Sequence, residues 1–477
     1  MNPFKASYDF IIVGAGPAGC TVASRLADAL PNKTILLVDA GGMNDDPSLQ
    51  NFGDRFWTLG EPGYNWGYRN TPQVNLAGRE ITYDRGKGLG GSTAVNFCVW
   101  TRGPQADFDR WAEMVEDETW DWHHVLERYR KPPANLTIMT EAAVDRLLFE
   151  GQKCIGVEIS GKEALAQEVI LSAGAIDSPK LLLLSGVGPQ EDLAKHGIPL
   201  VHDLLGIGRN LRDHLWLELV TTQKPGAHHR TSHITSPDEL QEARRQWLKD
   251  KASPLSVNLQ PQMIAYLKNN NILHSEEYED LDKSVRESYE NKTTPHYELI
   301  THLPSPIFKG PDNYIATGVA PMGTLSSGQV KLRSSNPQDP PLIDPKFLSH
   351  PFDRRNAIEA VRETLNLLDL PDLRKDRMCF AEGPDGQTDE ALLVSKGLTF
   401  VQKAGLSMWH MCGTVQMGKP SAPSTCVDTS FHVIGTHGLR VVDMSIAPFM
   451  PNAHTQAVAY LIGETAAEKI IKEYTGQ

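Results

Sequence analysis

Residues 8–42 contain the feature that most constrains the fold, a glycine-rich turn between an apolar strand and a helix. The apolar run at residues 10–13 predicts a buried parallel strand, and Gly14, Gly16 and Gly19 follow it in the spacing G-x-G-x-x-G. In such a unit the first glycine permits a tight turn, the second lets backbone approach a pyrophosphate, and the third lets a helix pack close to the sheet. The predicted helix, residues 18–29, points its positive end at the phosphates.

The segment after this helix supplies the acid that a nucleotide site of this kind uses. Residues 34–38 predict a second strand, and Asp39 follows twenty residues after Gly19. A carboxylate at this place accepts hydrogen bonds from the ribose hydroxyls of an adenine dinucleotide. The ordered strand, glycines, helix, strand and acid therefore predict a dinucleotide site, with an empty α/β crevice as the structural alternative. The unit does not distinguish FAD from NAD.

Length and charge limit the class of protein. A chain of 477 residues is too long for one ordinary core, so two or three domains are expected. The net charge of −13 argues against a general nucleic-acid partner. No run of eighteen apolar residues is present, and residues 1–7 are too short and polar for a signal peptide, so we expect a cytoplasmic protein with no membrane span.

The six cysteines lack C-x-x-C spacing and stand largely in apolar surroundings. We therefore expect reduced, buried side chains, with no disulfide and no metal role. They are Cys20, Cys98, Cys154, Cys379, Cys412 and Cys426.

A second glycine-rich segment, residues 85–96, reads RGKGLGGSTAVN. Its glycines leave many backbone N–H donors free and add almost no side-chain bulk, which suits a second approach to phosphate or flavin. A plain glycine turn is the alternative. The aromatic, turn-rich residues 42–84 before it predict either a lid over the cofactor or an irregular satellite core.

A third strand–turn–helix unit occupies residues 168–186. Residues 168–172 predict a strand, and Ser178 followed by Pro179 predicts the N-cap and first position of a helix that Ser185 and Gly186 end. The helix start offers further donors to the dinucleotide, although a purely structural unit reads the same way.

The middle of the chain, roughly residues 206–399, loses the βαβ rhythm. Residues 238–249 and 275–291 predict helices, and residues 296–303, 314–322 and 329–333 predict strands. A mixed or antiparallel sheet with helices on one side is the economical interpretation, and it predicts a separate α+β substrate domain.

The last eighty residues carry the candidate chemistry. Residues 439–442 predict a strand that ends at Asp443, and Asn452 is predicted to cap a helix that runs to about Lys472 with an apolar inner face. The positive end of this helix, beside a flavin, would stabilise negative charge near N1. His410 and His454 each stand at the mouth of an apolar element, and no H-x-x-x-H spacing or companion carboxylate indicates a metal.

Two long motifs resemble the signatures of the glucose-methanol-choline (GMC) oxidoreductases. Residues 86–109 match the first in the glycine pair Gly90-Gly91, Asn96, Trp100 and Gly103, and residues 174–188, GAIDSPKLLLLSGVG, match the second. The resemblance implies an α/β fold: a Rossmann-like FAD-binding domain of the glutathione-reductase type with a second α+β substrate domain. We expect the first domain at residues 1–205 plus 425–477 and the second at residues 206–424.

The resemblance also implies a function. It is that of an FAD-dependent oxidoreductase that oxidises the CH–OH group of a primary or aryl alcohol, including polyhydroxylated and secondary-metabolite alcohols, by hydride transfer to flavin N5 and then to an electron acceptor. The residue at the His410 position acts as base toward the hydroxyl, and the residue at the His454 position orients that hydroxyl. The implied FAD-binding residues, with Val144 as a backbone clasp for adenine, are Gly14, Gly16, Ala18, Gly19, Asp39, Ala40, Gly88, Gly91, Ser92, Asn96, Val144, Asp443 and Thr455.

One departure from the family pattern follows residue 131. A family member continues there through a long stretch of cap and substrate-domain sequence, whereas this chain passes through Pro132-Pro133 directly into residues 135–138. The omission leaves the glycine loops, Asp39 and both histidines in place but alters the wall of the substrate pocket. Two alternatives therefore stay open: a non-redox flavin-containing lyase or cyclase, and a catalytically impaired flavin-binding remnant.

Overall fold

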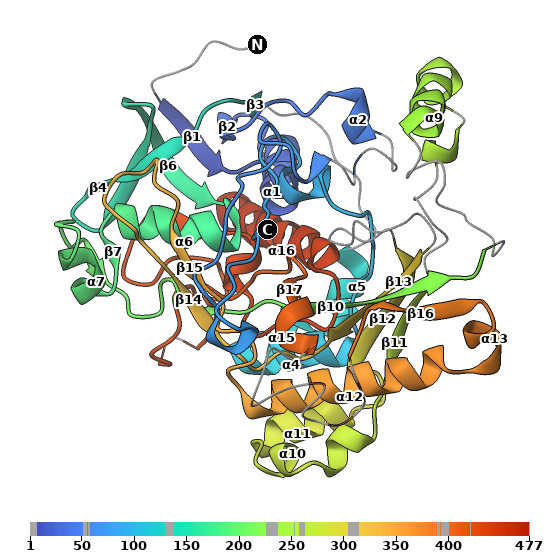
Figure 1. Ribbon diagram of the computed structural model, residues 1–477. Coiled ribbons are helices and arrows are strands. Elements are labelled where there is room, and N and C mark those ends of the chain that lie inside the picture. The colour runs from blue at the N-terminus through green and yellow to red at the C-terminus, as the bar shows by residue number, and fades with distance from the viewer. Residues whose placement is uncertain are drawn as a thin grey trace.

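The computed structural model describes residues 7–50, 55, 58–128, 138–225, 237–251, 253–256, 263–303, 314–384, 386, 388, 392, 400–419 and 421–476. Two sheets with separate apolar clusters organise these residues (Figure 1). Residues 129–137, where the sequence departs from the family pattern, lie outside the described part of the chain.

The first sheet has a parallel centre. Strand β1 (Ser7–Val13) lies between β2 (Ile35–Val38) and β6 (Lys162–Leu171), parallel to both. Strand β3 (Ile138–Met139) extends the sheet beyond β2, and β18 (Leu439–Val441) pairs with β6. Strands β4 (Val144–Glu150) and β5 (Lys153–Ile159) continue from β6 as an antiparallel meander. This arrangement confirms the Rossmann-like α/β domain.

Helices α1 (Pro17–Ala29) and α16 (Thr455–Thr475) pack against each other beside this sheet (Figure 1). Gly463 allows the close crossing, because a Cβ there would lie 2.7 Å from the Ala18 carbonyl oxygen. The predicted inner face of α16 is confirmed: Val458, Leu461, Ile462 and Ala466 are all buried. The crossing places the first turn of α1 against the ninth residue of α16, so helices from opposite ends of the chain pack together.

Helix α6 (Gly174–Leu184) begins earlier than the sequence predicts, so the N-cap assignment of Ser178 is wrong. Pro179 lies inside the helix and has no N–H for the Ala175 carbonyl. The Thr414 hydroxyl replaces that donor, at 2.7 Å from Ala175 O. A distant side chain therefore stabilises a proline position that local rules assign to a helix start. The predicted end is confirmed, with Ser185 at the C-cap.

The second sheet is antiparallel, which confirms the α+β expectation. Its strands run in the order β11 (Met263–Leu267), β12 (Tyr297–Leu303), β13 (Tyr314–Pro321), β10 (Leu215–Gln223) and β16 (Arg377–Glu382), and β17 (Leu406–Ser407) also pairs with β10. The strand predicted at 329–333 joins another sheet instead. It is β14 (Gly328–Lys331), which lies between β9 (Arg209–Leu211) and β15 (Leu342–Asp344).

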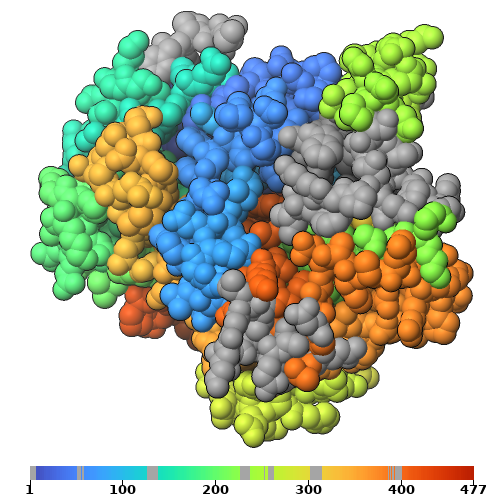
Figure 2. Space-filling view, in the orientation of Figure 1, coloured from blue at the N-terminus to red at the C-terminus, as the bar shows by residue number. Residues whose placement is uncertain are grey.

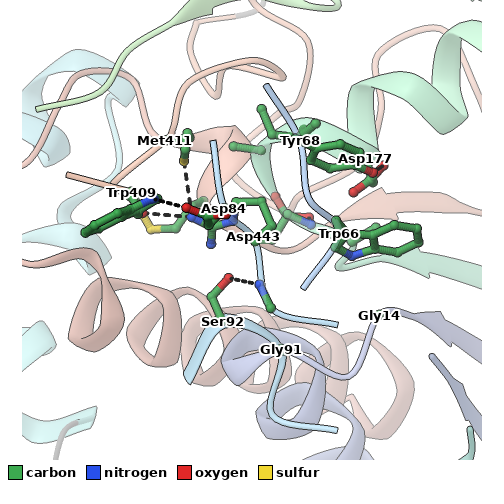
Figure 3. Close-up of a pocket in the computed structure, with 18 of the residues that line it drawn as sticks. Gly14, Trp66, Tyr68, Asp84, Gly91, Ser92, Asp177, Trp409, Met411 and Asp443 are labelled. Atoms are coloured by element: carbon green, nitrogen blue, oxygen red, sulfur yellow. Dashed lines mark hydrogen bonds between the residues drawn. The ribbon is translucent and has the colours of Figure 1, made fainter. Parts of the chain in front are cut away.

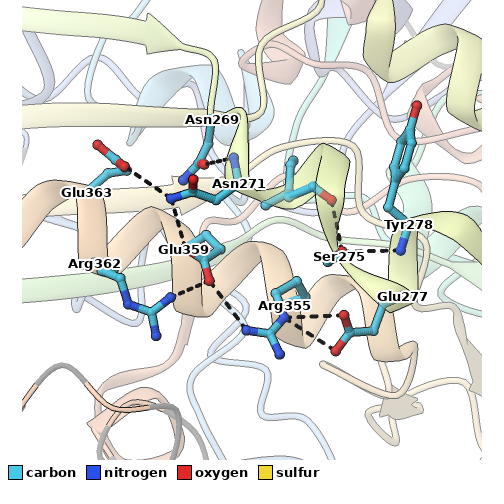
Figure 4. Close-up of polar contacts among 10 residues, drawn as sticks. Asn269, Asn271, Ser275, Glu277, Tyr278, Arg355, Glu359, Arg362 and Glu363 are labelled. Atoms are coloured by element: carbon cyan, nitrogen blue, oxygen red, sulfur yellow. Dashed lines mark hydrogen bonds and ion pairs between the residues drawn. The ribbon is translucent and has the colours of Figure 1, made fainter.

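Helix α12 (Pro351–Leu368) packs on this second sheet and was not predicted. The helix predicted at 275–291 is broken into α10 (Glu276–Glu279) and α11 (Lys283–Glu290). A polar cluster joins α12 to α10 (Figure 4): buried Glu359 accepts hydrogen bonds from Arg355 and Arg362, and Arg355 also pairs with Glu277 at 3.3 Å.

Shorter or peripheral elements complete the described part. The helices are α2 (Pro47–Gln50), α4 (Gln105–Val115), α5 (Trp122–Arg128), α7 (Gln190–Ala194), α9 (Pro237–Asp250), α13 (Pro371–Arg374) and α15 (Phe400–Ala404). The 3-10 turns are η1 (Val74–Leu76), η2 (Gly91–Ala94), η3 (Glu118–Trp120), η4 (Pro254–Ser256), η5 (Asn271–His274) and η6 (Met444–Ile446), and β7 (Val187–Gly188) pairs with β8 (His202–Asp203).

The six cysteines carry free thiols, as predicted. The expectation of burial is wrong for Cys379, which is exposed on the edge strand β16, a strand with no buried residue, and Cys20 and Cys98 are only partly buried. Within the described residues, no group of three or more His, Cys, Asp and Glu side chains could hold a metal ion. Among the same residues, none of the helices has the length and apolarity needed to cross a membrane.

Candidate active site

A cavity of about 860 Å³ runs between the two sheets, from the start of α1 to the segment that carries His410. Its volume is in the range of cofactor and ligand sites. On one face of the molecule the light-blue segment before residue 100 crosses between the green surface of the first domain and the orange surface of the second (Figure 2). The cavity therefore takes its lining from both domains.

The first glycine loop shapes one end of the cavity. Gly14 has φ +102°, and a Cβ there would lie 2.4 Å from the Ser172 carbonyl oxygen. A Cβ at Gly19 would lie 2.0 Å from the Gly14 oxygen, so this glycine permits close packing and does not itself line the cavity. Gly16 does line it and faces open space. Because no side chain caps α1 at Gly16, the first amides of the helix stay available to an anion.

The second glycine loop lies directly against the first. A Cβ at Gly91 would lie 2.9 Å from Gly16 Cα, and the Ser92 hydroxyl accepts a hydrogen bond from Gly86 N at 3.1 Å (Figure 3). Gly91 and Ser92 line the cavity with Ala18 of α1. The two loops thus form one cradle of backbone donors.

Asp39 joins these loops. Its Oδ2 accepts from Ala15 N at 2.8 Å, and its Oδ1 accepts from Gly41 N at 2.9 Å and Gly88 N at 3.0 Å. Asp39 and Ala40 both line the cavity. Gly88 does not line it, and contributes to the site through its hydrogen bond to Asp39. The carboxylate keeps further lone pairs for a ribose. The Asp39 carboxylate also holds three backbone segments together, a role that was not predicted from the sequence.

The opposite wall of the cradle comes from the C-terminal region. Asp443 accepts from Gly174 N at 2.9 Å and from the Ser178 hydroxyl at 2.5 Å, and burial raises the pKa of its carboxyl. Asn96 donates to the Gln456 side chain at 2.7 Å. Asp443, Asn96 and Thr455 all line the cavity.

Helix α16 begins at the cavity without a side-chain cap. Its N-cap residue is His454, so the prediction that Asn452 caps this helix is wrong. The backbone N–H and side-chain amide of Asn452 instead donate to the buried carboxylate of Asp107. As at α1, the first backbone amides are left for an anionic group, which suits the N1 side of a reduced flavin.

Another part of the cavity wall is formed by Val144, the first residue of β4, and by the aromatic segment. Trp66 and Tyr68 stack with ring centroids 5.7 Å apart, and the Tyr68 hydroxyl donates to Asp177 at 2.7 Å (Figure 3). Other aromatic and apolar side chains of this segment, such as Leu76 and Tyr83, pack in the core. These apolar side chains of residues 42–84 thus belong to the main cluster of the second sheet and not to a satellite core, while Trp66 and Tyr68 line the cavity; a lid over the cofactor stays a prediction.

The two candidate catalytic histidines meet at the other end. The ring centroids of His410 and His454 lie 4.7 Å apart at 71°, and both residues line the cavity. His410 is only 7% exposed, and its backbone N–H donates to Asp213 at 2.8 Å. Asp213 also accepts from the Ser407 hydroxyl at 2.5 Å, which fixes the His410 segment.

The side chains that contact His410 and His454 were not predicted from the sequence. His214 Nδ1 lies 2.9 Å from His410 Nδ1, and Glu298 Oε1 lies 2.7 Å from His454 Nε2. Glu298 is fully buried, on β12. His214 immediately precedes β10, and neither residue has a local pattern that relates it to a histidine so far along the chain.

The buried rings are held neutral. Burial, with a smaller contribution from His454, lowers the pKa of His214 to about 3. Burial and the neighbouring His454 and His214 rings set the pKa of His410 well below 6.5. A neutral imidazole at pH 7 can accept a proton from a hydroxyl group.

An adenine–flavin dinucleotide fits this arrangement of residues. Two glycine loops and two uncapped helix starts offer backbone donors to its anionic groups, and the histidines stand beyond the α16 end, where a flavin ring would react.

Comparison with known families supports the same conclusion. Models described as GMC oxidoreductase match residues 8–133, 130–216 and 324–463. The first two matches meet at residues 130–133, where the sequence departs from the family pattern.

Curated relatives match nearly the whole chain. An alcohol dehydrogenase [acceptor] of Pseudomonas putida is 28% identical over 561 residues, covering 98% of this chain and 96% of the relative. Human mitochondrial choline dehydrogenase is 29% identical over 575 residues, covering 98% and 90%. Because these alignments are longer than the 477-residue chain, they contain positions that have no counterpart here.

Solved structures share the fold. Formate oxidase of Aspergillus oryzae superposes with a TM-score of 0.85 at 24% identity over 99% of both chains, and a fungal aryl-alcohol oxidase with a TM-score of 0.79 at 22% identity over 99% and 100%. With the family matches and the cradle geometry together, the chain belongs to the GMC oxidoreductase family and its cofactor is FAD.

Proposed function

We propose that the chain is an FAD-dependent oxidoreductase that oxidises a primary or aryl alcohol to the carbonyl compound. The observation that carries the proposal is the pair of imidazoles, 4.7 Å apart, at the end of a dinucleotide cavity, with a third imidazole and a buried carboxylate behind them. Bound FAD supplies the hydride acceptor. The protein residues bind the alcohol, orient it and move its proton.

His410 is the proposed base. When its Nδ1–H donates to His214, Nε2 keeps a free lone pair for the proton of the substrate hydroxyl. The lowered pKa of His410 keeps this lone pair available at neutral pH.

His454 is the proposed orienting group. Its Nε2 is held by Glu298 at 2.7 Å, and its backbone N–H donates to the Thr101 hydroxyl at 3.0 Å. Glu298 therefore orients the ring while Thr101 holds its backbone, and the ring can direct the substrate hydroxyl toward His410.

The apolar side chains that line the cavity beside the histidines support the proposed substrate class. Trp216, Ile300 and Met408 line this part of the cavity, and the three side chains pack in one apolar cluster. An aromatic or aliphatic body would be desolvated there, while the hydroxyl meets the two imidazoles. The relatives named alcohol dehydrogenase and choline dehydrogenase support a CH–OH donor.

Anaerobic titration of the FAD-loaded protein with a panel of primary, aryl and polyhydroxylated alcohols tests the proposal. We expect aryl alcohols to bleach the oxidised flavin absorbance in the wild type and His410→Ala to slow that bleaching by at least about a hundredfold. Product formed while the flavin stays oxidised would instead support the non-redox lyase or cyclase. A yellow protein that no alcohol reduces would support the flavin-binding remnant.

A further inference from the structure

Gly318 lies in the middle of β13, between β10 and β12, at a place where the backbone does not require a glycine (Figure 1). It pairs with Glu218 on one side and Ile300 on the other, and the register through both pairs is regular. Its φ lies outside the left-handed region. Among the described strands of the second sheet it is the only glycine, although glycine weakens the interior of a strand.

The space above Gly318 is filled by the indole ring of Trp216. A Cβ at Gly318 would lie 1.7 Å from Cη2 of Trp216 and 1.9 Å from its Cζ2, far inside an ordinary contact of 3.4 to 4 Å. Trp216 stands two residues before Glu218 on β10, so its ring reaches diagonally to the neighbouring strand. The benzo end of the indole therefore occupies the gap that the absent side chain leaves.

The same face of the sheet borders the cavity beside the histidines. Ile300, the pairing partner of Gly318, lines the cavity together with Trp216 and Met408. Met408 stands two residues before His410, which lines the cavity as well. Because the sheet lies on the other side of the indole, an added side chain at Gly318 would push the ring away from the sheet and toward this cavity space.

We propose that Gly318 determines the size of the alcohol that the cavity admits, by letting the Trp216 indole lie against the sheet. This inference rests on the proposed alcohol oxidation. With glycine at this position, the ring leaves room for a bulky aryl body beside His410. A Cβ would require the contact to lengthen from 1.7 Å to at least 3.4 Å, and the indole would take that space from the substrate.

Gly318 itself does not line the cavity, so it acts through Trp216 as a positioning residue. The consequence is a preference between substrates and not a change in the chemistry at His410. A larger residue at position 318 should turn a pocket for aryl alcohols into one for small aliphatic alcohols.

Binding of two aryl probes to the FAD-loaded protein tests the proposal without turnover. Phenol and 2-naphthol differ by one fused ring, and neither has a CH–OH group to oxidise. Their dissociation constants, measured by isothermal titration calorimetry, therefore report the size of the pocket. We expect Gly318→Ala to weaken the binding of 2-naphthol at least about tenfold and that of phenol less than about threefold.

Two further variants separate the indole contact from general damage to the fold. Trp216→Leu removes the ring, and in that background Gly318→Ala should change the dissociation constant of 2-naphthol less than about twofold, because the added methyl group meets no indole. Gly63→Ala adds the same methyl group at a place outside the cavity where no atom lies within 4 Å, and should keep wild-type binding of both probes.

Trp216→Leu alone keeps the proposal testable if Gly318→Ala does not fold. Without the indole the pocket is deeper, so 2-naphthol should gain at least about threefold in affinity relative to phenol. An unchanged ratio of the two dissociation constants in Trp216→Leu would overturn the proposal.

Crystal structures of the FAD-loaded wild type and Gly318→Ala provide the structural readout. The indole is expected to move from the sheet toward His410 in the variant. An indole that keeps its wild-type place overturns the proposal, as do equal losses of phenol and 2-naphthol binding, a loss that persists in the Trp216→Leu background, or a wild type that binds neither probe. If the probes respond as expected while no alcohol reduces the flavin, the proposed oxidation fails and the role of Gly318 in pocket size stands.

Discussion

The Nδ1 atoms of His214 and His410 lie 2.9 Å apart in a buried contact. At this distance one ring donates its N–H and the other accepts, so the contact exists only while the accepting ring is neutral. Protonation of that ring would place two donors face to face. With His410 as the donor, the accepting ring is His214, so the contact links the neutral state of His214 to the packing between β10 and the segment after β17.

Acid stability is the first prediction. The pKa of His214 is about 3 in the folded chain, compared with 6.5 for an ordinary histidine, so only the unfolded state takes up this proton between these values. The stability present above pH 6.5 is then lost as pH falls toward 3, by up to about 5 kcal/mol. His214→Gln should reduce this loss, measured as the difference in unfolding free energy between pH 7 and pH 4.

The comparison must be made between variants at each pH. Asp107 and Asp213 have pKa values of about 6 through burial, and such groups gain stability as pH falls below 6. The control is His196→Gln, in the turn after α7 and away from the cavity, which should leave the pH 7 to pH 4 difference unchanged. An equal difference in His214→Gln and the wild type would contradict the prediction.

The pH dependence of turnover is the second prediction. His214 has a pKa of about 3, so its ring is neutral from pH 4 to 8 and accepts the hydrogen bond from His410 Nδ1–H. In His214→Phe this acceptor is absent, so protonated His410 is less stabilised, its pKa should fall further and the acid limb of kcat/KM should move to lower pH. Steady-state rates of the FAD-loaded enzyme from pH 4 to 8 measure the shift. An acid limb at the wild-type position would assign that limb to another group.

The contact between His454 and Glu298 gives the third prediction. Glu298→Gln keeps an oxygen that accepts from His454 but removes the buried charge, and Glu298→Leu removes both. We expect kcat to fall about tenfold to a hundredfold in the glutamine variant and further in the leucine variant. The flavin spectrum and FAD content should stay at wild-type values, because Glu298 does not line the cofactor cradle. Loss of FAD from Glu298→Gln would indicate a structural role instead.

Local patterns in the sequence predict most of the cofactor domain. The glycine turn, its flanking strands and α1 follow from contacts within about thirty residues, and the structure places them as expected. The start of α6 and the cap of α16 were predicted wrongly because contacts with residues far along the chain determine them. Thr414 completes α6 from 239 residues away, and Asp107 takes the side chain of Asn452 across 345 residues.

The same limit applies to the catalytic end. His410 and His454 could be selected because motifs surround them, whereas His214 and Glu298 contact them from 196 and 156 residues away. No spacing rule relates residues at such separations. Helix α12 was missed although its buried face is apolar in part, because buried Asp353, Asn356 and Glu359 interrupt the pattern.

Glu359 is one of these buried polar residues and gives the fourth prediction. It is 4% exposed and accepts from Arg355 and Arg362, whose side chains are partly in solvent. Glu359→Leu leaves both guanidinium groups without this partner and should lower the free energy of unfolding by about 1 to 3 kcal/mol. Glu363→Leu, one turn further along α12, partly buried and joined to Asn271 only by a long contact of 3.5 Å, should change it by less than about 0.5 kcal/mol. Chemical denaturation of both variants makes the comparison, and equal effects would contradict the assigned role.

The glycines of the first loop give the last prediction, because neighbouring positions should respond differently to one added methyl group. At Gly19 a Cβ would lie 2.0 Å from the Gly14 carbonyl oxygen, so Gly19→Ala should prevent α1 from packing and yield little folded protein. At Gly16 no atom lies within 4 Å of the added Cβ, and φ is −74°, which alanine adopts without strain. Gly16→Ala should therefore fold with the circular dichroism and unfolding midpoint of the FAD-free wild type. The methyl group would nevertheless occupy the space that Gly16 leaves open at the start of α1, so FAD affinity measured by flavin fluorescence should fall at least about tenfold. Wild-type FAD affinity in Gly16→Ala would mean that the pyrophosphate lies elsewhere in the cavity.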